Sequence, residues 1–166
     1  MPPEQPVSRP SVAEHLLLEF TALLRLQRQR GRGAGQQTPN ADRFAGDFRT
    51  NTSSDDDFIG FIFGFQYRQH FYVFDWKQND QNDPLGFAER GMSLKVVNAD
   101  TPLAESELWR TAGNGTRVQN LYHNTISYAD FTDYHFELLF TPDTITITVS
   151  QGATVLDTFT VNDSTY

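Results

Sequence analysis

Apolar and polar residues alternate in short runs throughout the chain after residue 40. The clearest run is TITITVS, residues 144–150, in which Ile145, Ile147 and Val149 alternate with threonines. Because successive side chains of a β-strand point to opposite faces, this alternation predicts a strand with one buried and one solvated face. Similar runs begin at residues 44, 59, 70, 91, 118, 134 and 154, and turn-forming Asn, Asp, Gly and Pro separate them. The pattern predicts an all-β antiparallel sandwich or jelly roll.

Two of these runs are expected to form a hairpin. The run IGFIFGFQ carries large side chains at its odd positions, which are Ile59, Phe61, Phe63 and Phe65. We expect these side chains to fill the core, while the glycines on the other face indicate a close backbone approach or a bend of the strand. The run HFYVFDWKQ follows after the short polar turn 67–69, so the two strands should pair.

Residues 1–40 have a different pattern. Ser11 to Glu14 show the S-x-x-E spacing of a capping box, and apolar residues then recur at spacings of three and four. We expect a helix from Val12 to Arg30, which could dock on the domain, be foreign to it or bind a partner. A Gly-, Gln- and Arg-rich linker follows it to Asn40. The expected division is an N-terminal helix and linker unrelated to the domain, residues 1–40, and a β-domain, residues 41–166.

The charge balance, the lack of cysteine and the short apolar runs argue against several classes of function. Residues 50–166 contain sixteen acidic and six basic side chains, a balance that repels nucleic-acid phosphates and favours cations. The chain has no cysteine, so neither a disulfide nor a Cys-ligated zinc site can form. No apolar run reaches the roughly 20 residues of a membrane span, and none has the layout of a secretory signal peptide. We expect neither nucleic-acid binding nor membrane insertion.

Two loops are rich in carboxylates and amides. The first, NTSSDDD at residues 51–57, precedes the first hairpin strand, and the second, NDQNDP at residues 79–84, follows the other strand. A hairpin would bring both loops to the same end of the sheet, where their charges repel one another unless a cation binds. Oxygen ligands of this kind suit calcium, although both loops could instead be solvated turns. The candidate ligands are Asp55, Asp56, Asp57, Asn79, Asp80, Asn82 and Asp83.

Four runs occur together and in order: DDDFIGFIFGFQ, HFYVFDWKQ, GMSLKVVN and VQNLYHNTISYADFTDYHFEL. In this combination the chain resembles the C-terminal domain of thrombospondins, in the form also found in bacterial proteins. The resemblance implies a lectin-like sandwich of the concanavalin type that is extracellular, binds calcium and serves in adhesion or matrix assembly. The family's domain has further strands at both ends, so we expect an incomplete domain here.

Other chemistries fit the sequence less well. The four histidines lie in separate segments, and no G-x-S-x-G nucleophile motif or complete phosphate-binding loop is present. Some glycoside hydrolases share this sandwich, but no predicted strand places two carboxylates on one face. Carbohydrate binding would need an exposed aromatic ring, for which Trp76, Trp109 and Tyr122 are candidates if they are not buried. We expect a non-catalytic, calcium-binding extracellular adhesion or matrix-interaction module, with calcium-dependent carbohydrate binding as the alternative.

Overall fold

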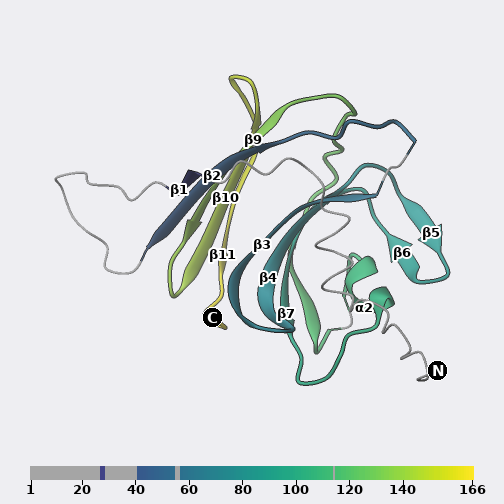
Figure 1. Cartoon of the computed structure of the whole chain (residues 1–166), viewed down its shortest axis with the longest axis vertical. Helices are drawn as coiled ribbons and strands as arrows, with labels where there is room; N and C mark the ends of the chain where they lie inside the picture. The colour runs from purple at the N-terminus through teal and green to yellow at the C-terminus, as the bar shows by residue number, and fades with distance from the viewer. Residues whose placement is uncertain (1–26, 29–40, 55–56, 114) are drawn as a thin grey trace, which may run out of the picture.

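The computed structural model describes residues 27–28, 41–54, 57–113 and 115–166, and Figure 1 shows two antiparallel sheets facing each other. The five-stranded sheet contains, in spatial order, β1 (Gln27–Arg28), β2 (Asp42–Phe48), β9 (Tyr134–Phe140), β10 (Thr144–Gln151) and β11 (Thr154–Asn162). The four-stranded sheet contains β3 (Phe58–Tyr67), β4 (His70–Lys77), β7 (Gly91–Asn98) and β8 (Val118–His123). A separate hairpin consists of β5 (Gln81–Asp83) and β6 (Gly86–Ala88), and helix α2 spans Glu105–Trp109. The predicted all-β sandwich is confirmed.

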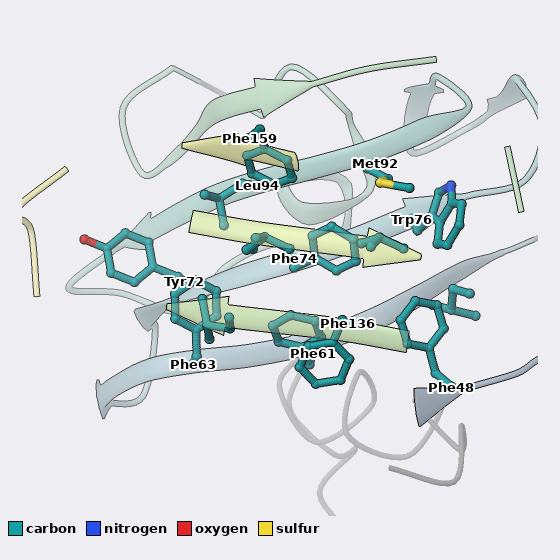
Figure 2. Packing of buried hydrophobic residues seen from close by; sticks show 14 of the residues in the cluster. Phe48, Phe61, Phe63, Tyr72, Phe74, Trp76, Met92, Leu94, Phe136 and Phe159 are labelled. Carbon is teal, nitrogen blue, oxygen red and sulfur yellow. The ribbon is translucent and has the colours of Figure 1, made fainter. Parts of the chain in front are cut away.

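The main core lies between the two sheets, as Figure 2 shows. Phe61 of β3 stacks on Phe74 of β4 with ring centroids 5.1 Å apart, and Phe136 of the facing sheet lies 4.2 Å from Phe61. The side chains of β10 that alternate with threonines are fully buried, as predicted: Ile145, Ile147 and Val149. Full burial of each large apolar side chain contributes about 1.5–3 kcal/mol. The alternation in the sequence therefore identifies much of this core.

One predicted core position is wrong. Phe65 is 60% exposed, because the pairing of β3 with β4 shifts register between Phe63 and Tyr67. Gly64, inside the shifted segment, has a φ of 59°, a left-handed conformation that glycine adopts without a steric cost. The bend turns Phe65 out of the core and onto the outer face of the sheet. There its ring stacks against Phe71.

A second apolar cluster covers the outer face of the four-stranded sheet. It combines residues of β4, β7 and β8 with residues of the segment that contains α2: Phe71, Val73, Val97, Ala99, Leu103, Leu108 and Val118. Leu108 is the buried residue of α2. Because this cluster lies opposite the main core, β4 is buried along its whole length. The face of β4 that carries Asp75 and Lys77 is thus enclosed as well.

The N-terminal helix prediction is wrong at Gln27 and Arg28. These residues form β1, which pairs with Ala45 and Phe44 of β2. Without β1, the edge of β2 would leave backbone N–H and C=O groups unpaired, and Gln27 and Arg28 pair with this edge. The spacing of apolar residues, from which the helix was predicted, carries no information about such pairing. The remainder of the predicted helix and the predicted linker, residues 12–26 and 29–40, lie outside the described residues. In the part of the chain that the structure describes, no helix is long and apolar enough to span a membrane.

Candidate functional site

The start of β3 and the end of β4 lie side by side at one end of the sandwich. Phe58 pairs with Lys77, so the loop before β3 and the segment after β4 converge. Lys77 joins them, because its Nζ lies 3.4 Å from Asp57 Oδ1 and donates a hydrogen bond to Gln81 Oε1 at 2.6 Å. The Lys77 side chain has no solvent exposure. Its ammonium therefore already offsets part of the negative charge at this end.

The second acidic segment is not an open loop but the hairpin β5–β6, which projects from the side of the sandwich (Figure 1). Asp80 Oδ1 accepts a hydrogen bond from the backbone N–H of Arg90 at 2.8 Å, across the base of the hairpin. Asp83 Oδ1 accepts one from the N–H of Leu85 at 2.9 Å, within its turn. Both carboxylates thus shape the hairpin, and Asp83 lies farther from Lys77 along it than Asp80 does.

The other predicted ligands fall in three different settings. Asn79 is exposed, and its side-chain amide approaches Gln78 Oε1 at 3.4 Å. Asn82 lies inside β5, where it pairs with Phe87. Asp55 and Asp56 lie outside the described residues.

A third segment reaches the same end of the sandwich, between β8 and β9. Asp130 Oδ1 accepts hydrogen bonds from Gln78 Nε2 at 3.1 Å and from Thr50 Oγ1 at 3.5 Å. The Ser127 hydroxyl donates to the carbonyl of Gln78 at 2.5 Å, and the N–H of Phe131 donates to the carbonyl of Thr50 at 2.9 Å. These bonds connect the third segment to both of the others. We call residues 49–54, 57, 78–83 and 124–133 the acidic rim.

Asp130 was not among the residues expected from the sequence. It follows Tyr128, whose hydroxyl donates to the backbone carbonyl of Asp57 at 2.7 Å. A usable signal was present, because Asp130 and Asp133 directly precede a predicted strand, as Asp55 to Asp57 do in the first loop. Its spatial neighbours could not be inferred, because β8 and β9 belong to different sheets and the segment between them crosses from one to the other.

The acidic rim offers oxygen ligands from three segments of the chain. Carboxylate, amide and carbonyl oxygens are the ligands that calcium prefers, whereas zinc favours histidine nitrogen and cysteine sulfur. Among the residues with a described placement, no group of three or more His, Cys, Asp or Glu side chains is arranged to hold a metal ion. A calcium shell here would therefore combine Asp57, Asp80 or Asp130 with backbone carbonyls, amides or water.

The aromatic rings considered for carbohydrate binding make internal contacts. Trp76 has 0% exposure, and the Trp109 indole donates to the carbonyl of Gly86 at 3.1 Å. Tyr122 stacks on Phe159 with ring centroids 3.8 Å apart. Phe131 of the acidic rim, in contrast, is 52% exposed and has a positive φ of 55°.

Comparisons with known proteins agree with the sequence runs. The family model described as the thrombospondin C-terminal region matches residues 27–166, beginning at the first residue of β1. Thrombospondin-2 of Homo sapiens is 38% identical over 136 residues, which cover 74% of this chain and 12% of that protein. Thrombospondin-1 of Xenopus laevis is 35% identical over 136 residues, with the same coverage of 74% and 12%.

Cartilage oligomeric matrix protein of Rattus norvegicus is 35% identical over 122 residues, which cover 68% of this chain and 16% of that protein. The aligned segment is thus a small part of each relative's length. The family model nevertheless covers most of the present sequence. The resemblance inferred from the sequence is confirmed, and the chain belongs to the thrombospondin C-terminal region family.

Proposed function

We propose that this chain is a non-catalytic, calcium-binding module that interacts with extracellular matrix or cell-surface partners. The observation that carries the proposal is the acidic rim, where three segments bring carboxylate, amide and carbonyl oxygens to one end of the sandwich. Membership of the thrombospondin C-terminal family supports a matrix role, and the name of one relative places that relative in cartilage matrix. The partner would be an extracellular protein or glycan.

Electrostatics also supports a cation at the rim. Lys77 places a positive charge 3.4 Å from Asp57 Oδ1. A divalent cation would offset the negative charge of the other rim carboxylates in the same way. Asp57, Asp80 and Asp130 are the proposed carboxylate ligands, with Asn79 as a possible amide ligand. Asp55 and Asp56 stay predictions from the sequence.

Calorimetry tests the proposal. Calcium should raise the melting temperature of the purified protein, and chelation should lower it, because a ligand that binds only the folded state stabilises that state. Asp130→Asn should reduce the calcium-dependent shift. Asp143→Asn is the matched control, since this exposed carboxylate lies in the β9–β10 turn outside the rim. A folded protein whose melting temperature does not respond to calcium would refute calcium binding.

A second candidate function is calcium-dependent carbohydrate binding at the same rim. The observation that favours it is Phe131, whose exposed ring lies beside Asp130 in a backbone conformation that costs bulky residues energy. Binding on a glycan array in the presence of calcium should be lost in Phe131→Ala. It should persist in Phe87→Ala, which removes a ring 44% exposed on the β5–β6 hairpin. An array without binding by the folded, calcium-loaded protein argues against this function.

A further inference from the structure

Asp75 of β4 and Lys95 of β7 meet in a buried site beneath α2, on the outer face of the four-stranded sheet. Lys95 Nζ lies 2.8 Å from Asp75 Oδ2, and the two side chains are 0% and 7% exposed. Lys95 Nζ also donates to the carbonyl of Leu108 in α2 at 2.9 Å. The ring of Phe58 covers the ammonium, with its centroid 5.3 Å from Nζ. Solvent is therefore excluded from the contact.

As an ion pair, this contact is poorly satisfied. The second carboxylate oxygen, Asp75 Oδ1, is buried and has no hydrogen-bond partner among the residues that the structure describes. An unsatisfied buried polar atom costs about 1–3 kcal/mol, and desolvating two charges can cost more than their mutual attraction returns. The proposed calcium-binding function makes no use of Asp75 or Lys95. A neutral linkage between the two side chains would remove both buried charges.

We propose that Lys95 and Asp75 condense to an intramolecular amide bond that links β7 to β4. A proton passes from the ammonium to the carboxylate, and the neutral Nζ then attacks Cγ of Asp75. The Nζ–Cγ bond forms, one Cγ–O bond breaks, and that oxygen leaves as water with the transferred proton and one further proton from Nζ. The ammonium and carboxylate thus become one amide and one water molecule, with no oxidant, reductant or other reactant.

The fold positions the two groups for this reaction. β4 and β7 pair without interruption. Lys95 lies opposite Val73, and Ser93 lies opposite Asp75, so Asp75 and Lys95 are diagonal neighbours on the same face of the sheet. Well-oriented intramolecular groups react at effective concentrations of about 10⁵–10⁸ M.

The surroundings also suit the product. The amide keeps one hydrogen on Nζ, and this hydrogen can continue to donate to the carbonyl of Leu108. Ser93 is buried and pairs directly across from Asp75, so its hydroxyl is the donor that we assign to the new carbonyl oxygen.

Intact-mass spectrometry of the folded protein, denatured just before measurement, tests the proposal. The mass should be lower than the sequence mass by one water molecule, and digestion should release a branched peptide that joins Asp75 to Lys95. Lys95→Arg should show the full sequence mass, because arginine keeps the positive charge but is not a comparable nucleophile. Lys77→Arg is the matched control and should still lack one water molecule.

Two results would overturn the proposal. A wild-type mass equal to the sequence mass would show that Asp75 and Lys95 form an ion pair only. A water loss that persists in Lys95→Arg would place the linkage at other residues. Neither measurement involves calcium, so the outcome is independent of the proposed function of the acidic rim.

Discussion

Gly60 of β3 lies where a side chain has no room. A Cβ atom at this position would be 2.0 Å from the backbone carbonyl oxygen of Phe74 on the neighbouring strand. The sequence suggested either a close backbone approach or a bend for the two glycines of this run. The structure shows the close approach at Gly60 and the bend at Gly64. Both glycines lie between large apolar residues of the same strand, but one allows close backbone packing and the other allows a bend.

Gly60→Ala should therefore destabilise the protein more than an ordinary glycine replacement. We expect a loss of more than about 2 kcal/mol in the free energy of unfolding, measured by urea denaturation, because the backbones of β3 and β4 must separate. The control is Gly152→Ala, where φ is 57° and no atom of the described residues lies within 4 Å of the added Cβ. Its cost should be limited to left-handed strain of about 1–2 kcal/mol. Equal losses would contradict the close approach.

At the scale of single elements, the long strands could be predicted and the short elements could not. β10 alternates over its whole length, so its pattern alone identifies strand, buried face and exposed face. Helix α2 has five residues, which is too short for a helical period to show. The strands of the β5–β6 hairpin have three residues each, too few for an alternation to show, so the sequence predicts a loop at residues 79–84.

Tertiary contacts hold these short elements in place. The Trp109 indole donates to the carbonyl of Gly86, and Arg110 Nε donates to the carbonyl of Leu85 at 3.1 Å. Both bonds join the end of α2 to the β5–β6 hairpin. These contacts cannot be predicted from local sequence patterns, because the bonded residues lie more than twenty positions apart. For the same reason β1 could not be predicted, because it forms only by pairing with the edge of β2.

At the scale of the whole molecule, the candidate site was partly predictable. The hairpin argument correctly places the start of β3 beside the end of β4, because antiparallel pairing follows from a short turn. The contribution of Asp130 depends on a crossing between sheets, which local patterns do not specify. The position of Lys77 between Asp57 and Gln81 likewise depends on the fold, because the two partners come from different segments of the chain.

The opposite end of the sandwich should make stability sensitive to alkaline pH. Burial, followed by the hydrogen bond to Asp163, raises the pKa of Tyr72 well above its ordinary value of 10, and burial raises the pKa of Tyr166 to about 12. Below pH 10 both tyrosines are neutral in the folded and unfolded states. Above pH 10 the unfolded chain releases these protons first, so the unfolded state is favoured.

We therefore expect the free energy of unfolding to fall as the pH rises from about 10 to about 12. Urea denaturation at a series of pH values measures this decline, and tyrosinate absorbance follows the ionisation. Tyr72→Phe removes one of the two groups and should make the decline shallower. A variant with the same slope as the wild type would show that Tyr72 does not carry the effect.

The enclosure of β4 between two apolar clusters affects how binding experiments on this domain should be interpreted. All eight residues from His70 to Lys77 are buried, and both neighbouring strands are paired to this one. Amide hydrogens at the centre of this strand should exchange with solvent only when the whole domain unfolds. A synthetic peptide with the β4 sequence would therefore display side chains that a partner of the native domain never meets.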